Sequence, residues 1–108
     1  MFINRKEAAA MADDATKVAP HIYKVLFENE RVRMLEVSMQ PGDRSELHSH
    51  PAYWVYLLSG GKVRFTTPSG ETAEMEMPTG ASMWRDAEEH STENIGGTNL
   101  RALFCEPK

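Results

Sequence analysis

The chain has one cysteine, no long apolar segment and no cluster of basic residues, and each absence removes a class of protein. Cys105 alone cannot form an intramolecular disulfide, and we expect it to pack as a small hydrophobe in the last strand. The longest apolar stretch, residues 55–58, is far too short to span a bilayer. The 12 basic residues are scattered among 16 acidic ones, so a nucleic-acid partner is not expected. We therefore expect a cytoplasmic protein that binds neither membrane nor nucleic acid.

The length of 108 residues fits a single domain with a modest core. A metal, closure of a sheet into a barrel, or dimerisation would each help so short a chain to fold stably. Residues 1–14 are rich in alanine and charge without an amphipathic pattern, which predicts a loose helical turn or a disordered leader. Met11 also looks like a natural start, which would make the first ten residues an upstream extension. We predict an N-terminal extension over residues 1–20 and one folded domain over residues 21–108.

From residue 21 onward, short runs rich in β-branched and aromatic residues alternate with turn signals. The predicted strands are residues 22–28, 31–39, 44–50, 53–58, 62–67, 71–77, 81–85, 90–94 and 100–106. No helical pattern intervenes, so the spacing predicts an all-β sandwich or barrel. The alternation reverses at Met34 and Leu35, which predicts a β-bulge or burial of both faces. Residues 53–58 lack a polar face, so a partner subunit or the N-terminal segment is expected to cover their outer side.

Three of the four histidines lie in two short polar segments. Residues 42–50 read Gly-Asp-Arg-Ser-Glu-Leu-His-Ser-His, and residues 90–94 read His-Ser-Thr-Glu-Asn. Side chains two residues apart on a strand point to the same face, so His48 and His50 would converge, with Glu46 beside them. His90 would supply a third imidazole for a metal. The His-x-His pair taken alone would fit an exposed face equally well.

The first of these segments resembles the first conserved motif of the cupin superfamily, G-x5-H-x-H-x3,4-E-x6-G. Gly42, His48 and His50 match its spacing, and Gly60 or Gly61 meets the later glycine. This part of the resemblance alone would be weak.

The second segment resembles the second cupin motif, G-x5-P-x-G-x2-H-x3-N. Gly80, His90 and Asn94 match it, with Asp86 at the proline position and one residue missing where the second glycine would stand. The two motifs together cover residues 42–94 in the right order. The resemblance implies an all-β double-stranded β-helix, which is the jelly-roll barrel of cupins, preceded by a short N-terminal extension.

The chain departs from the family at the glutamate that normally joins the three histidines on the metal. Tyr53 holds this position if Gly60 is the motif glycine, Trp54 holds it if Gly61 is, and the longer spacing gives Val55. We favour Tyr53, because this register keeps the apolar run aligned with the family's strand. None of the three offers a carboxylate. Either the site has degenerated and binds a ligand without metal, or it is a three-histidine centre.

In the second interpretation, His48, His50 and His90 hold one divalent transition metal, Fe(II) by preference, with Zn, Ni, Mn or Cu as alternatives. Such a centre resembles that of thiol dioxygenases and of the β-diketone-cleaving dioxygenase. The resemblance implies a dioxygenase acting on a small anionic or chelating metabolite, of the β-diketone, thiol or keto acid class. The alternatives are a non-oxidative isomerase, epimerase or lyase acting on a sugar or organic acid, and a non-catalytic small-molecule-binding cupin. The family's habit of association also implies a homodimer.

Tyr53 and Glu46 are the candidate catalytic residues. The Tyr53 hydroxyl would hydrogen-bond a metal-bound water, the substrate or dioxygen. Glu46 would be a displaced fourth ligand, an acceptor that fixes a histidine tautomer, or the partner of a surface ion pair. Arg85 is the preferred receptor for a substrate carboxylate. The predicted substrate pocket is lined by Phe65, Met83, Trp84, Arg85 and Phe104.

Overall fold

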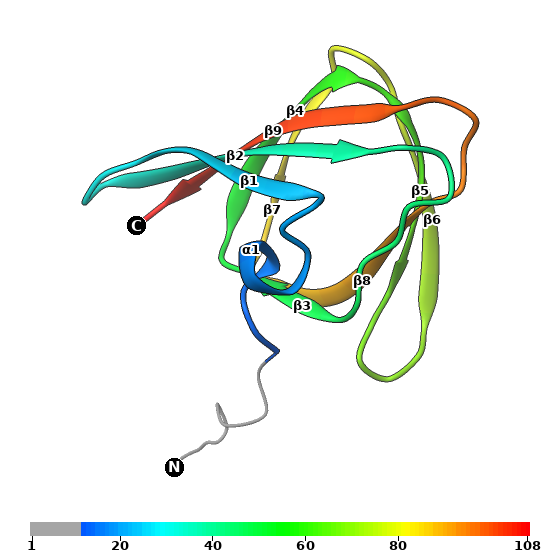
Figure 1. Ribbon diagram of the computed structural model, residues 1–108, viewed down its shortest axis with the longest axis horizontal. Helices are drawn as coiled ribbons and strands as arrows, with labels where there is room; N and C mark the ends of the chain where they lie inside the picture. Colours follow the sequence, from blue (N-terminus) through cyan, green and yellow to red (C-terminus); the bar gives the residue numbers. More distant parts are fainter. Residues whose placement is uncertain (1–11) are drawn as a thin grey trace.

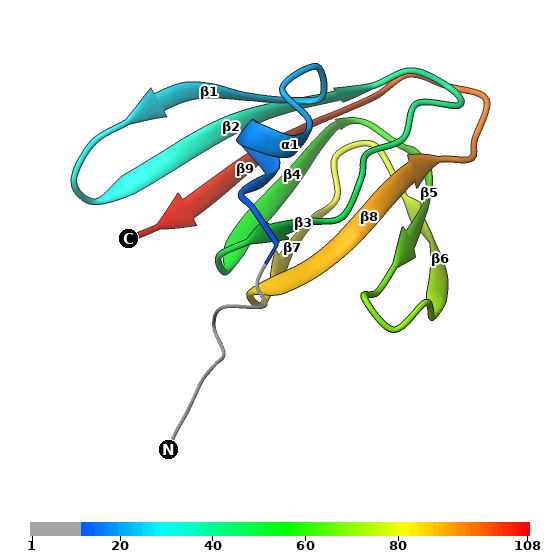
Figure 2. The same ribbon diagram turned by 60° about the horizontal axis from the view of Figure 1, so that its bottom comes forward.

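The computed structural model describes residues 12–108 as two antiparallel sheets that enclose a barrel (Figures 1 and 2). One sheet has five strands in the order β1 (Tyr23–Glu28), β2 (Val32–Met39), β9 (Leu100–Pro107), β4 (Tyr53–Ser59) and β7 (Ser82–Arg85). The other has the order β3 (His48–His50), β8 (Glu88–Asn94), β5 (Gly61–Thr66) and β6 (Thr72–Met77). The predicted all-β architecture is confirmed. Of the leader predicted over residues 1–14, residues 1–11, which include the possible start at Met11, lie outside the described residues.

Strict alternation along the long strands builds the core. In β4, Tyr53, Val55 and Leu57 are buried between the sheets, whereas Trp54 and Tyr56 point outward and are exposed. Period-two alternation is what a strand with one face against a core requires. The outer side of β4, expected to be covered, is open in the part of the chain that the structure describes.

The bulge considered at Met34 and Leu35 of β2 lies instead in the neighbouring strand β1. β2 pairs with β9 without interruption along its whole length. The neighbouring strand β1 carries the irregularity, because its register shifts between Val25 and Phe27, opposite Leu35 and Met34. Alternation along β2 buries Leu35 inside, while Met34 pairs with Phe27 on the outer face of the sheet.

Two motif glycines form turns that no other residue type adopts without strain. Gly42 precedes the histidine strand β3 and has φ 87°, and Gly80 precedes β7 and has φ 84°. A Cβ atom disfavours such positive φ values, so glycine is the residue of choice there. The two turns thus direct the chain into the segments that reach the site.

The N-terminal strap, residues 13–19, packs against the barrel through the short helix α1 (Ala15–Val18). Asp14 caps this helix by accepting a hydrogen bond from the backbone N–H of Thr16 at 3.0 Å. Ala15 and Ala19 are fully buried. The backbone N–H of Ser49 donates to the carbonyl of Asp13 at 2.8 Å, so the strap covers the edge of β3 that β8 does not pair with. Among residues 12–108, no helix is both long and apolar enough to cross a membrane.

Candidate metal centre

Three histidine side chains meet inside the barrel where β3 pairs with β8. His48 lies opposite His90 in the ladder, and His50 lies two residues further along β3 on the same face. All three are at most 3% exposed. One ring nitrogen from each lies within 4.8 Å of the others, and Nε2 of His48 is 3.0 Å from Nε2 of His50. The sequence therefore brings together the two histidine segments as predicted.

The surroundings keep the β3 imidazoles neutral. Burial lowers the pKa of His48 to about 4, although a hydrogen bond to the Glu46 carbonyl partly opposes this shift. Burial, followed by repulsion from His48 and His90, lowers the pKa of His50 to about 3. At 2.9 Å from the Glu46 carbonyl oxygen, which can only accept, Nδ1 of His48 carries the proton. Its Nε2 is left with a lone pair, the form in which histidine binds a metal.

The geometry of this cluster fits a metal ion. Two nitrogens that each lie about 2.1 Å from one ion, at a right angle to each other, are about 3.0 Å apart. This is the separation of the two Nε2 atoms on β3. Among the described residues, no aspartate or glutamate joins the group. Three imidazole donors without a carboxylate suit Fe, Zn, Cu or Ni rather than Mg or Ca.

Tyr23 covers one side of the cluster, a role that the sequence did not suggest. Its ring packs edge-on against His48 and His50, at centroid distances of 5.1 and 5.3 Å. Its hydroxyl lies 3.4 Å from Oγ1 of Thr92, and burial raises its pKa to about 12. Tyr23 therefore stays neutral and shields the imidazoles from water.

A second polar cluster lies directly beside the histidines, built from Tyr53, Arg85 and Glu88. The Tyr53 hydroxyl donates to Oε2 of Glu88 at 2.6 Å. The Arg85 guanidinium holds the same carboxylate through two bonds, of 2.9 and 2.7 Å. Oε1 of Glu88 is 3.4 Å from Nδ1 of His90. Burial alone would raise the pKa of Glu88, but its contacts with His90, Arg85 and Tyr53 hold the pKa well below its ordinary range.

Glu88 is the residue that sequence reasoning missed. We expected a strand to begin at His90, whereas β8 begins at Glu88. Continuing the alternation of His90 by two residues toward the N-terminus would have placed Glu88 on the same inner face. The motif glutamate that is missing after the His-x-His pair has a counterpart in Glu88, an acid on another strand. Glu88 lies beside His90 but does not belong to the group of candidate ligands.

The remaining candidates are divided by the direction of their side chains. Tyr53 points inward and is 1% exposed, whereas Trp54 points outward and is 51% exposed. The expectation that Glu46 shares a strand face with the histidines is wrong, because β3 begins only at His48 and the Glu46 side chain is exposed. Only its backbone carbonyl contacts the site. The placement of Trp84 in the pocket is also wrong, because its side chain is 56% exposed on the outer face.

Two cavities meet at this site. The inner one has a volume of about 30 Å³, is mostly apolar, and is lined in part by Tyr53, Phe65, Arg85, His90 and Phe104. The outer one is a cleft of about 340 Å³ between the β5–β6 hairpin and the start of β8. Phe65, Arg85 and His90 line both. The ring of Phe65 stacks on that of His90, with the centroids 4.8 Å apart, and the Arg85 guanidinium lies over the Phe65 ring at 4.7 Å from its centroid.

Met83 supports this wall without lining either cavity. It pairs with Val55 across β7 and β4 and packs against the core. Of the five residues predicted to line the pocket, Phe65, Arg85 and Phe104 line the inner cavity. A separator of three side chains, Phe65, Arg85 and His90, stands between the cleft and the inner cavity.

The fold is similar to that of several solved structures. No family model matches the chain, and no curated protein does. A cupin domain from Bordetella pertussis Tohama I is 29% identical, with a TM-score of 0.73, over 81% of this chain and 92% of that one. An RmlC-like cupin family protein from Methanocaldococcus jannaschii is 13% identical, with a TM-score of 0.62, over 99% of this chain and 89% of that one.

A third solved structure is the polyketide cyclase RemF from Streptomyces resistomycificus, which is 18% identical, with a TM-score of 0.59. The alignment covers 98% of this chain and 80% of RemF. These matches confirm the double-stranded β-helix predicted from the two motifs. Because its two sheets match those of cupin domains and place the motif histidines together inside the barrel, the chain is a small barrel protein of the cupin superfamily.

Proposed function

We propose that the protein is an Fe(II)-dependent dioxygenase with a three-histidine centre, acting on a small anionic or chelating metabolite. The observation that carries this proposal is the convergence of three buried imidazoles with no carboxylate in the group. His48, His50 and His90 would hold the ion, and Fe(II) would supply the one-electron chemistry that dioxygen requires. With no carboxylate among the residues that would hold the ion, the site favours an anionic substrate.

Tyr53 acts in this proposal as a neutral hydroxyl that Glu88 holds in place beside the site. Burial, followed by the neighbouring Glu88 charge, raises the pKa of its hydroxyl far above the physiological range. The hydroxyl therefore keeps its proton and does not serve as a base. The hydroxyl donates its one hydrogen bond to Oε2 of Glu88 at 2.6 Å, which fixes its orientation and leaves the lone pairs of its oxygen to accept a hydrogen bond from a ligand beside the histidine cluster.

The sizes of the two cavities support a substrate position in the cleft. A volume of about 30 Å³ holds a water molecule or two. The organic part of the substrate therefore occupies the cleft of about 340 Å³, which is within the range of ligand pockets. Arg85 reaches both spaces and would receive a carboxylate there. Glu71 and Glu89 on the rim of the cleft disfavour a substrate with several negative charges.

Metal analysis of the purified protein tests the first half of the proposal. We expect close to one Fe(II) per chain after anaerobic loading, and almost none in the His48→Ala/His50→Ala variant. Glu46→Gln is the matched control, because its side chain is exposed and only its carbonyl touches the site. Equal, low occupancy in all three proteins would refute the metal centre.

Oxygen consumption tests the second half. The Fe(II)-loaded protein is supplied with acetylacetone, thioglycolate or pyruvate as representatives of the three substrate classes. We expect at least one to drive oxygen uptake that zinc-loaded protein does not support, and Tyr53→Phe to slow it. Product formation by the zinc form would instead indicate a non-oxidative reaction. Thermal stabilisation by a probe without turnover in either form would indicate a binding protein.

A further inference from the structure

The Nδ1 atoms of the three clustered histidines have different surroundings. Nδ1 of His48 lies 2.9 Å from the carbonyl oxygen of Glu46. Nδ1 of His50 and Nδ1 of His90 are buried, and neither has a well-aligned hydrogen bond among the described residues. A buried N–H group without an acceptor destabilises a protein, so such a nitrogen either carries no proton or gains an acceptor.

An oxygen that can accept one more hydrogen bond lies beside Nδ1 of His90. Oε1 of Glu88 is 3.4 Å from this nitrogen. Oε2 of Glu88 already accepts two hydrogen bonds, from the Tyr53 hydroxyl and from Nε of Arg85. Oε1 accepts one, from Nη2 of Arg85. Because each carboxylate oxygen has two lone pairs, the oxygen with a lone pair to spare is the one that lies next to the histidine.

We propose that Glu88 is a positioning residue for His90, which accepts the proton of Nδ1 in a hydrogen bond and so directs Nε2 toward the ion. This inference rests on the metal centre of the proposed function. A metal-bound histidine usually donates its other ring N–H to an acceptor such as a carboxylate, which fixes the tautomer and makes the imidazole a stronger ligand. Glu88 thereby supplies, through His90, the negative charge that the group of ligands lacks among the described residues.

The neighbouring residues hold both partners in place for this contact. Glu88 and His90 are two residues apart on β8 and therefore share its inner face. The charge-assisted bonds from Arg85, together with that from Tyr53, prevent the carboxylate from turning away. The ring of Phe65, stacked on His90, restricts the plane of the imidazole. Hydrogen bonds of this kind are often long without the ligand and tighten once it binds, so a small rotation is enough to close the contact.

Zinc titration of the full chain, in competition with a chelating dye, tests the role of Glu88. We expect Glu88→Gln to raise the dissociation constant for zinc about 10-fold, because the acceptor becomes neutral, and Glu88→Ala to raise it about 100-fold, because the acceptor is removed. Glu89→Gln is the matched control, because it removes the same charge from the next residue of β8, whose side chain alternates to the other face. It should leave the affinity for zinc unchanged.

The outcomes separate the two proposals. A wild-type protein that binds no zinc would refute the metal centre, and this inference with it. Zinc bound equally well by the wild type and by both Glu88 variants would overturn only the role of Glu88. An equal loss of affinity in Glu89→Gln and Glu88→Gln would also overturn it, because the effect would then come from the total charge and not from the contact with His90.

The ring protons of the zinc-loaded protein give a second measurement, which a merely structural role of Glu88 would not change. Long-range NMR correlations between protons and ring nitrogens show which nitrogen of each histidine carries the proton. We expect His90 to carry it at Nδ1, with an N–H resonance at low field that moves to higher field in Glu88→Gln. The N–H of His48, which donates to the Glu46 carbonyl, is the internal reference and should stay in place. A proton at Nε2 of His90, or a resonance that does not move in Glu88→Gln, would overturn the proposal.

Discussion

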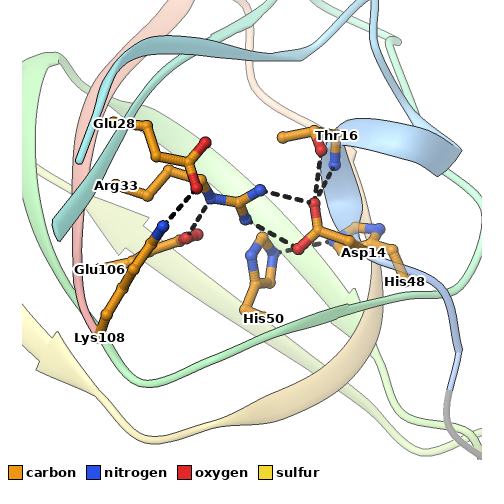
Figure 3. A network of polar contacts seen from close by, with 8 residues as sticks. All are labelled: Asp14, Thr16, Glu28, Arg33, His48, His50, Glu106 and Lys108. Carbon is orange, nitrogen blue, oxygen red and sulfur yellow. Dashed lines mark hydrogen bonds and ion pairs between the residues drawn. The ribbon is translucent and has the colours of Figure 1, made fainter. Parts of the chain in front are cut away.

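Two arginines flank the histidine cluster, and each holds a carboxylate by two hydrogen bonds, yet they join different parts of the chain. Arg33 binds Asp14 through both terminal nitrogens, at 3.2 and 2.8 Å, and binds Glu106 through Nε at 2.6 Å. Figure 3 shows this network beside His48 and His50. It ties the N-terminal strap and the C-terminal strand to β2. Arg85, by contrast, binds Glu88, only three residues away, at the edge of the open cleft.

The difference separates a network that assembles the fold from one that faces a ligand. Glu106 is almost completely buried, so the charge of Arg33 offsets a carboxylate that has little access to water. The Arg33 and Asp14 pair also holds the strap against Ser49, the residue between the two ligand histidines of β3. Arg85 and Glu88 join a single turn and are each 20% exposed. Breaking this ion pair would destabilise the fold only slightly, and the Arg85 guanidinium would then be available to a substrate.

Removal of each arginine side-chain charge should expose this contrast most strongly. Arg33→Met leaves the buried Glu106 carboxylate unpaired, and we expect it to reduce the free energy of unfolding by about 3 kcal/mol. Arg85→Met leaves Glu88 with the Tyr53 hydroxyl and some solvent, and should cost about 1 kcal/mol. Urea denaturation of the metal-free proteins measures both values. Equal losses would mean that the two networks do not differ in structural importance.

The second contrast concerns ligands. Arg85→Gln should weaken binding of thioglycolate or pyruvate to the zinc-loaded protein by about 10- to 100-fold, because a charged hydrogen-bonding partner is lost. Binding of acetylacetone, which has no carboxylate, should change little, and so should the affinity for zinc. Isothermal titration calorimetry measures all three. Arg101→Gln is the control, because Arg101 pairs with Glu36 at 2.6 Å and neither residue lines the cleft or the inner cavity. Equal weakening of all ligands by Arg85→Gln would contradict the assigned role.

The charge on Asp14 should appear in the acid stability of the protein. Burial pushes the pKa of Asp14 upward, but hydrogen bonds from Arg33 and Thr16 outweigh it and hold the pKa at about 2, below the ordinary 3.8. A carboxyl group with a depressed pKa stabilises the folded state fully above its unfolded pKa, and this contribution is lost as the pH falls through its folded pKa. Between about pH 4 and pH 2, wild-type stability should therefore fall toward that of Asp14→Asn.

Asp14→Asn is a sharp variant for this purpose, because asparagine also caps helices well and only the charge changes. At neutral pH we expect it to be less stable than the wild type by about 1 kcal/mol. Thermal melts at a series of pH values follow the difference. Burial raises the pKa of Glu106, so this residue changes the stability with pH in the direction opposite to Asp14. Glu106 is present in both proteins, so it does not change the sign of the difference in stability between them. A difference that stays constant down to pH 2 would exclude the Asp14 carboxylate as its source.

The sequence predicted those features that depend on local spacing and missed those that depend on register between distant strands. His48 and His50 converge because alternation within one strand is a local property, and the two motifs located His90. The ion pairs of Arg33 join it to Asp14 and Glu106, which are 19 and 73 positions away in the sequence. No pattern within a single predicted strand encodes such pairs. The error at Trp84 came from its closeness to the motifs in the chain. Its parity with Trp54 across the β4–β7 ladder sends it outward instead.

The smallest expected effect is that of Glu106→Gln, which is best measured beside Glu88→Gln. In the Arg85 network both oxygens of Glu88 accept hydrogen bonds. Glu88→Gln would turn an amide N–H toward one of these donors, and we expect it to lower the free energy of unfolding by about 1 to 2 kcal/mol. In the Arg33 network only Oε1 of Glu106 accepts a bond, and Oε2 has no partner among the described residues. Glu106→Gln keeps that acceptor and removes a poorly solvated charge, so stability should change by less than about 1 kcal/mol. Urea denaturation at neutral pH compares the pair, and a larger loss for Glu106→Gln would show that Arg33 needs the full charge of both its partners.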